Sequence, residues 1–253
     1  MNLSSNTILI TGGASGIGLE LAEAFLKEGN EVIICGRRES LLQDVKTKYP
    51  QLHIKQVDLS VSDERKSFAQ WLIRDFPKLN ILVNNAGIQR EFRVDQDNLA
   101  EVFENENEIE TNFTAPVHLT FLLLPHLMSQ ADAAIVNISS GLGLVPLAIM
   151  PVYSATKAAM ISFTKSLRHQ LQNSRVKVFD VVPPIVDTDL DKGARDRRGQ
   201  TNKGIQPAQV VKETLKAMKA DQLDVAVGMV KMLKIGSRIT PSGFFAIMNK
   251  KAR

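Results

Sequence analysis

Tyr153 and Lys157 are the two side chains whose types and spacing best suit proton transfer. They stand four residues apart in the run Tyr153-Ser154-Ala155-Thr156-Lys157, and residues four apart on a helix project from the same face. A free tyrosine has a pKa near ~10 and is a poor base at neutral pH, but a neighbouring ammonium group favours the phenolate. The pair is therefore a candidate proton donor and acceptor for interconverting a carbonyl and an alcohol. The same spacing is common in pairs on helix surfaces, so it does not identify an enzyme by itself.

A glycine-rich turn near the start of the chain is a candidate phosphate-binding site. The run Thr11-Gly12-Gly13-Ala14-Ser15-Gly16-Ile17-Gly18 follows an expected strand and opens an expected helix. Glycines there let backbone approach a pyrophosphate, and the first helical turn offers N–H donors with a partial positive charge. The spacing differs from G-x-G-x-x-G, and a tight turn without a ligand would use the same glycines. The strand-turn-helix context favours dinucleotide binding.

The turn after the second expected strand bears on the choice of dinucleotide. Many dinucleotide sites have an acidic residue there that binds the adenosine ribose. Here Arg37 and Arg38 occupy the turn, and Glu39 follows them. Two arginines can hold a 2′-phosphate through charge-assisted hydrogen bonds, although they are also ordinary residues for an exposed turn. We expect NADP(H) to be preferred over NAD(H).

The elements that must position these residues follow a regular order. Short apolar runs typical of strands alternate with longer stretches of helical periodicity. The expected strands are 7–10, 31–35, 53–57, 81–83, 134–138 and 176–182. The expected helices are 18–28, 39–49, 63–76, 99–128 with a break near Asn112, and 152–173. This alternation predicts a doubly wound parallel sheet, the Rossmann-type α/β fold, with helices on both faces. We expect one domain over 1–253, with 187–206 as a substrate lid.

Composition argues against several other classes of protein. The net charge of +4 is weak and scattered, so no nucleic-acid partner is expected. Residues 133–156 lack charge but contain Pro146 and Pro151, so we expect neither a membrane span nor a membrane partner. The four histidines lack metal-ligand spacing, so no metal is expected. No signal peptide is visible, and the single cysteine, Cys35, lies in an apolar run. We expect a buried, inert thiol in a cytoplasmic protein.

Taken together, these motifs resemble the short-chain dehydrogenase/reductase superfamily in its single-domain form, and they occur in that family's order along nearly the whole chain. The double proline Pro183-Pro184, with elements near Ser237 and Met248, is similar to bacterial Dlt-operon-type oxidoreductases. The resemblance implies an oxidoreductase that transfers a hydride between NADP(H) and a small carbonyl or alcohol substrate. Its implied catalytic residues are Asn112, Ser140, Tyr153 and Lys157. With the two arginines, its implied cofactor-binding residues are Gly12, Ser15, Gly16, Ile17, Gly18, Arg37, Arg38, Asp58, Leu59, Asn85, Ala86, Gly87, Tyr153, Lys157, Val186 and Thr188.

The resemblance also implies a role for each catalytic residue. Tyr153 would exchange a proton with the substrate oxygen, and Ser140, 13 residues earlier, would hydrogen-bond that oxygen. Lys157 would hold the nicotinamide ribose, and Asn112 would hold helix backbone and a water. Ser139 is then a structural residue. Pro184 replaces the family's usual glycine, which puts the local backbone there in doubt.

Two alternatives and one assembly remain open at this stage. The alternative from another class is a catalytically idle NADP(H)-binding sensor or scaffold, which would need only the nucleotide turn. A sugar-nucleotide epimerase would require a larger C-terminal substrate domain. Apolar residues between 142 and 150 could line a substrate pocket or simply pack their loop.

A homodimer is expected through the helices around 111–131 and 152–173. Residues 111–131 carry no charged side chain, and a helix apolar on all sides must be covered on all sides.

Overall fold

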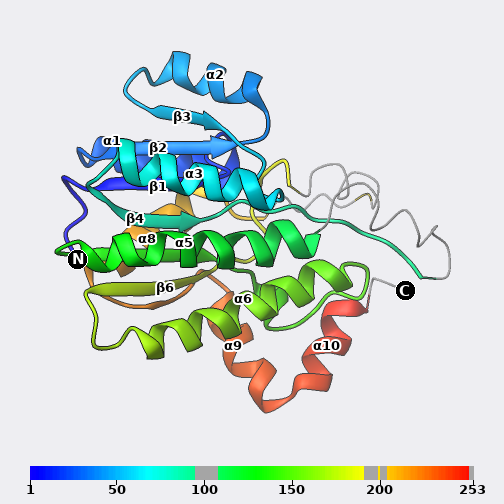
Figure 1. Cartoon of the computed structure of the whole chain (residues 1–253). Coiled ribbons are helices and arrows are strands. Elements are labelled where there is room, and N and C mark those ends of the chain that lie inside the picture. The colour runs from blue at the N-terminus through cyan, green and yellow to red at the C-terminus, as the bar shows by residue number, and fades with distance from the viewer. Residues whose placement is uncertain (95–107, 191–198, 200–203, 251–253) are drawn as a thin grey trace.

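A parallel sheet of seven strands forms the centre of the protein in the computed structural model, which describes residues 1–94, 108–190, 199 and 204–250 (Figure 1). The strands pair in the order β3-β2-β1-β4-β5-β6-β7. They are β1 (Thr7–Thr11), β2 (Glu31–Gly36), β3 (His53–Gln56), β4 (Leu79–Asn84), β5 (Ala133–Ile138), β6 (Val176–Val182) and β7 (Asp224–Ala226). The order reverses between β1 and β4, and in doubly wound sheets the ligand binds at the carboxyl ends of the strands beside such a reversal.

Helices cover both faces of this sheet. Figure 1 shows α3, α5 and α6 in front of the strands, with α1 and α8 behind them. The α-helices are α1 (Gly16–Lys27), α2 (Glu39–Lys48), α3 (Ser62–Asp75), α5 (Ala115–Ser129), α6 (Pro151–Gln170), α8 (Pro207–Lys219), α9 (Val230–Ile239) and α10 (Pro241–Asn249). Two short segments complete the site region, a π-helical turn η1 (Glu110–Thr114) and a 3₁₀ turn η2 (Gly141–Gly143).

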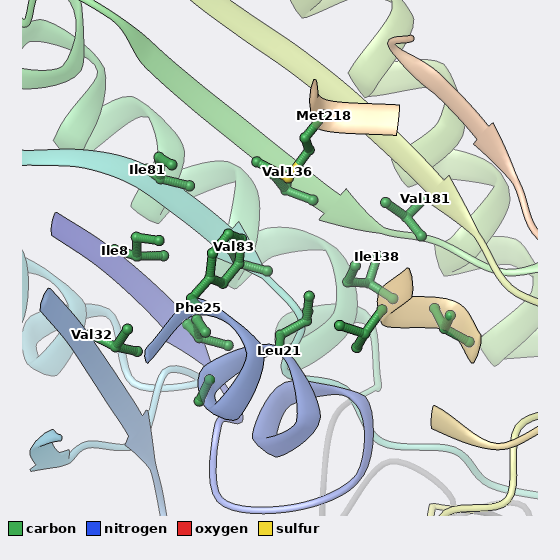
Figure 2. Packing of buried hydrophobic residues seen from close by; sticks show 14 of the residues in the cluster. Ile8, Leu21, Phe25, Val32, Ile81, Val83, Val136, Ile138, Val181 and Met218 are labelled. Carbon is green, nitrogen blue, oxygen red and sulfur yellow. The ribbon is translucent and has the colours of Figure 1, made fainter. Parts of the chain in front are cut away.

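Two hydrophobic clusters, one on each face, hold the helices on the sheet. Successive side chains of a strand point to opposite faces, so Ile8 packs in one cluster and Leu9 in the other. Figure 2 shows the first cluster, in which Leu21 and Phe25 of α1 contact the strands together with Met218 of α8. Strands that are apolar on both faces are typical of a covered parallel sheet, and this explains their near-continuous apolar sequence.

The six expected strands are present with small shifts at their ends, and so are the expected helices where the structure describes them. The expected break near Asn112 is the π-helical turn η1, which runs directly into α5. Cys35 is buried as expected, and burial raises the pKa of its thiol to about 12. Strand β7 and the helices after residue 206 were not anticipated from the sequence.

Two expectations fall partly outside the described residues. Of the expected helix 99–128, residues 99–107 are not described. Of the expected lid 187–206, the structure describes 187–190, 199 and 204–206. At the base of that segment, Val186 and Ile205 form a parallel bridge. No described helix is long and apolar enough to cross a membrane.

Candidate active site

The glycine turn after β1 has glycine at the positions where a side chain would clash with its neighbours or strain the backbone. Gly12 and Gly16 have φ values of +63° and +54°, which disfavour other residues. A Cβ on Gly18 would lie 2.4 Å from the carbonyl oxygen of Gly12. Ser15 is the N-cap of α1, yet its side chain makes no capping hydrogen bond. The turn therefore offers close-approaching backbone and the first N–H groups of α1, the donors that a pyrophosphate requires.

Replacing Gly18 with alanine is expected to weaken dinucleotide binding and folding together. The new methyl group would overlap Gly12 backbone, and overpacking of this kind typically costs about 1–3 kcal/mol. Gly36→Ala is the matched control for folding, because a Cβ there meets nothing within 4 Å. Thermal unfolding of both variants and NADPH titration of Gly18→Ala measure the effect. Equal melting of the two variants would contradict this account of the turn.

Thr11 and Asn85 join the glycine turn to the end of β4. The Thr11 hydroxyl accepts hydrogen bonds from the backbone N–H groups of Asn85 and Ala86, both at 3.0 Å. The Asn85 amide donates to the carbonyl oxygens of Thr11 at 2.9 Å and Gly12 at 3.2 Å. Asn85 thus shapes the site from within the protein. Thr11 was absent from the expected site residues, although its position directly before the glycines marked it.

The residues expected at the adenosine end lie on two neighbouring turns. Arg37 and Arg38 are exposed after β2, and the Gln56 side chain donates a hydrogen bond to the Arg37 carbonyl oxygen at 3.2 Å. The Asp58 carboxylate accepts hydrogen bonds from the backbone N–H and the hydroxyl of Ser60. Leu59 is buried in the core. The structure therefore leaves the two arginine side chains on the surface, and it places the Asp58 carboxylate in a local turn.

Asn112 ties the π-helical turn to the segment after β4. Its side-chain oxygen accepts from the backbone N–H of Ile88, and its amide donates to the Ile88 carbonyl oxygen, both at 2.8 Å. The amide also lies 3.3 Å from the hydroxyl of Thr156. The expectation that Asn112 holds helix backbone needs correction, because its backbone partner is this connecting segment.

The π-helical turn has its own anchor, which sequence reasoning did not find. The buried guanidinium of Arg65 pairs with Glu110 at 2.7 Å and donates to His118 Nδ1 at 3.1 Å. The same guanidinium donates to the carbonyl oxygen of Leu59 at 2.5 Å. Arg65 therefore connects α3 to the turn that carries Asn112. The sequence indicated this role only weakly, because an arginine in a polar helix is usually a surface residue.

Lys157 lies at the centre of the described site. Its ammonium nitrogen is 5.6 Å from the centroid of the Tyr153 ring, as four-residue helical spacing predicts. The ammonium donates to the carbonyl oxygen of Ile138 at 3.0 Å. A Cβ on Gly87 would lie 3.7 Å from the same nitrogen and 3.3 Å from Asn112 Oδ1. Lys157, Tyr153, Asn112 and Gly87 are thus brought together from three elements.

Burial changes the acid–base behaviour of Lys157. Desolvation lowers the pKa of this buried ammonium group to about 8, and the charge of Asp180 opposes that shift. Burial raises the pKa of the Asp180 carboxyl, and the hydrogen bond that Ser139 donates to it at 2.7 Å acts in the opposite direction. Ser139 is therefore a structural residue as expected, since its hydroxyl holds Asp180 behind the lysine.

Ser140 lies on the loop that packs against α6. It is buried, and its hydroxyl accepts a hydrogen bond from the backbone N–H of Leu142 at 3.1 Å. The backbone of Gly143 lies so close to Lys157 that a Cβ would come within 2.7 Å of it. The Gly141 N–H donates to the carbonyl oxygen of Pro183, so the double proline holds this loop. Ser140 and Tyr153 therefore lie on segments in direct contact.

Val186 and Thr188 follow β6 on the other side of the glycine turn. The Thr188 side chain would lie 3.0 Å from a Cβ on Gly16, so Thr188 borders the first turn of α1. The Val186 side chain is buried in the core, which leaves only its backbone for a ligand. Ile17 also packs partly against that cluster.

A pocket of about 350 Å³ lies beside this site, between the Ser140 loop and the C-terminal helices. Its wall is mostly apolar, with two hydroxyl groups. The lining residues are Leu144, Val145, Pro146, Ser237, Pro241, Ser242 and Phe245. Part of the expected 142–150 segment therefore lines a cavity. Among the described residues, no cluster of His, Cys, Asp and Glu could hold a metal ion.

Comparison with known proteins gives a consistent result. The family model for short chain dehydrogenases matches residues 6–199. The oxidoreductase DltE of Bacillus subtilis, itself described as uncharacterised, is 45% identical over 249 residues, covering 98% of each chain. A short chain dehydrogenase from Burkholderia cenocepacia in complex with NADP superposes with a TM-score of 0.84 at 26% identity, covering 98% of this chain and 99% of that one. An NAD complex from Burkholderia phymatum superposes with a TM-score of 0.83 at 19% identity, covering 95% and 96%, and supports the fold alone.

Proposed function

The chain belongs to the short-chain dehydrogenase family, as its motifs predicted, and from that premise we propose that it is an NADP(H)-dependent reductase or dehydrogenase of a small carbonyl or alcohol substrate. The observation that carries the proposal is the placement of Lys157 5.6 Å from the Tyr153 ring, beside the loop of Ser140. A protein that only sensed the nucleotide would need the glycine turn but no such group.

The proposed mechanism assigns one task to each side chain. Tyr153 gives a proton to the carbonyl oxygen or removes it from the alcohol, and Ser140 hydrogen-bonds that oxygen. Lys157 binds the nicotinamide ribose and favours the phenolate form of Tyr153. Asn112 positions the backbone at Ile88 next to these groups. The glycine turn and the first N–H groups of α1 would hold the pyrophosphate of the dinucleotide, which would supply or accept the hydride.

The test of this proposal is a panel of aldehydes and ketones scored by loss of NADPH absorbance. Ketones with an apolar part are the first choice, because the adjacent pocket is lined mainly by apolar side chains. Reduction of at least one compound, abolished by Ser140→Ala, is the expected result. Tight NADPH binding without turnover across the panel would instead favour the idle sensor or scaffold.

NADP(H) should be preferred over NAD(H) because two exposed arginines occupy the turn after β2. Loss of one charge-assisted hydrogen bond typically costs on the order of 1.5–3 kcal/mol, or roughly tenfold to a hundredfold in binding. Arg37→Ala should weaken NADPH by that factor and leave NADH nearly unchanged, as measured by fluorescence titration. Arg175→Ala is the control, since Arg175 is exposed just before β6, at the opposite end of the sheet. Equal losses for both cofactors would contradict the assignment.

The protein should form a homodimer through α5 and α6. The sequence predicts that α5 is apolar on all sides. The sheet covers only one side of α5, and Phe121 on that helix remains 52% exposed. Phe163 of α6 contacts Phe121 edge-to-face, with ring centroids 5.8 Å apart, so the two helices share an aromatic surface. Light scattering at micromolar concentration should give twice the chain mass, and Phe121→Asp should halve it. Ile73→Asp, at an exposed position of α3, should leave the mass unchanged. A monomer mass for the unchanged protein would refute the dimer.

A cytoplasmic location is part of the proposal. It is supported by the lone cysteine, which is buried and has no partner for an internal disulfide.

A further inference from the structure

The last two helices form a hairpin at the surface, beginning beside strand β7 at the edge of the sheet (Figure 1). Gly236 of α9 has no side chain, and the Phe244 ring of α10 fills the space where its Cβ would be. Asn249 fixes the hairpin to the active-site loop, because its side chain accepts from the N–H of Ala148 at 2.6 Å and donates to the carbonyl oxygen of Pro146 at 3.1 Å. The hairpin is therefore a packed part of the structure.

One face of α9 exposes apolar side chains to solvent. Met232 and Ile239 are 77% and 75% exposed, and Ile235 lies between them on the same helical face. Ile247 on α10 is 70% exposed. Residues 229–247 hold six of the fourteen large apolar side chains that are exposed in the described residues. A helix face of this kind is normally covered by something.

The charge of the same segment is entirely positive. The last 29 residues contain six of the 31 lysines and arginines of the chain and none of its 27 acidic residues. Lys231 and Lys234 are paired with Glu213 and Asp224, which lie outside the segment. Arg238 and Lys250 are exposed. By sequence, Lys251 and Arg253 add two more positive charges at the end of the chain.

We propose that the α9–α10 hairpin binds the surface of an anionic lipid bilayer, with the apolar face of α9 inserted at the interface. Exposed Met and Ile flanked by Arg and Lys is the combination by which interfacial helices bind such surfaces. A second copy of the chain is a poorer occupant, because two identical hairpins would bring like charges together. The proposal is independent of the catalytic assignment. The proposal replaces the expectation that the protein has no membrane partner. That expectation rested on the absence of a membrane-spanning segment, and a helix bound at the surface of a bilayer does not need to span it.

Sedimentation of the full-length protein with vesicles tests the proposal. Vesicles of phosphatidylcholine with a quarter of phosphatidylglycerol should bind the protein, and pure phosphatidylcholine vesicles should bind it at least about tenfold less. The triple variant Met232→Ser, Ile235→Ser, Ile239→Ser should lose at least about tenfold in partitioning. The control is Val61→Ser with Ile73→Ser, which removes exposed apolar groups from the α3 region. Circular dichroism confirms that each variant is folded.

Charge variants provide the second arm of the test. Each basic residue near an anionic surface contributes about fivefold in partitioning, so Arg238→Gln with Lys250→Gln should lose on the order of twentyfold. Lys165→Gln with Arg175→Gln, exposed elsewhere, should leave binding unchanged. Failure of the wild type to bind anionic vesicles, equal binding to both vesicle types, or full binding by the triple variant would each overturn the proposal. If the triple variant had half the wild-type mass in light scattering, the apolar face of α9 would be assigned to a second copy of the chain. If the protein bound a purified acidic protein saturably and did not bind vesicles, the face would be assigned to a protein partner.

Discussion

Tyr153→Phe should lower kcat and kcat/KM for carbonyl reduction by roughly 10²–10⁴-fold and leave NADPH binding nearly unchanged. The substitution keeps the ring, so the packing of α6 against the Ser140 loop and the position of Lys157 should survive. What is removed is the hydroxyl that we place at the substrate oxygen. The loss should appear in both kinetic parameters because the proton moves in the transition state.

The chain provides an unusually close control for this experiment. Tyr49 is the only other tyrosine, and the ammonium nitrogen of Lys48 lies 4.8 Å from its ring centroid. It is thus a second tyrosine–lysine pair, but it lies directly after α2, where the Tyr49 side chain is half-buried against the first hydrophobic cluster and Lys48 is exposed. Tyr49→Phe should retain full activity. Wild-type turnover by Tyr153→Phe would show that the proposed mechanism is wrong, while equal losses in both variants would point to a general effect of the substitution.

The parts of the site that could be predicted from sequence are those set by local periodicity. Tyr153 and Lys157 meet because a helix repeats every four residues or so, and Gly12 and Gly18 approach because the turn between them is short. Strands were recognised from continuous apolar runs, which a sheet covered on both faces requires.

The parts that could not be predicted depend on contacts between distant segments. Asn112 binds Ile88, and Arg65 pairs with Glu110 45 residues away; only the folded chain brings these partners together. Strand β7 has three residues, too few for a periodic signal. Helices α9 and α10 direct apolar side chains to solvent, which is the reverse of the pattern that reveals an ordinary surface helix.

Lys157→Met should abolish most activity and at the same time stabilise the cofactor-free protein at pH 7. Burial lowers the pKa of Lys157 from 10.5 to about 8, and that difference corresponds to roughly 3 kcal/mol of unfavourable free energy when the ammonium is charged. Methionine fills a similar volume without a charge. The Ile138 carbonyl oxygen loses its hydrogen-bond donor, which costs about 1 kcal/mol of the stability gained. The free energy of unfolding should therefore rise by about 2 kcal/mol. Activity should fall on the order of 10²-fold, with weaker NADPH binding.

The pH dependence distinguishes this cause from general repacking. Below about pH 8 Lys157 is protonated in both folded and unfolded chains, so the full cost of burying the charge is present there. Between about pH 8 and 10.5 the unfolded chain binds a proton that the folded chain has released, so wild-type stability rises with pH. The advantage of Lys157→Met in urea unfolding should therefore shrink across this window, while Lys165→Met, exposed on the same helix, should show no advantage at any pH. A constant advantage from pH 7 to 10 would mean that packing, and not the buried charge, determines the stability of this site.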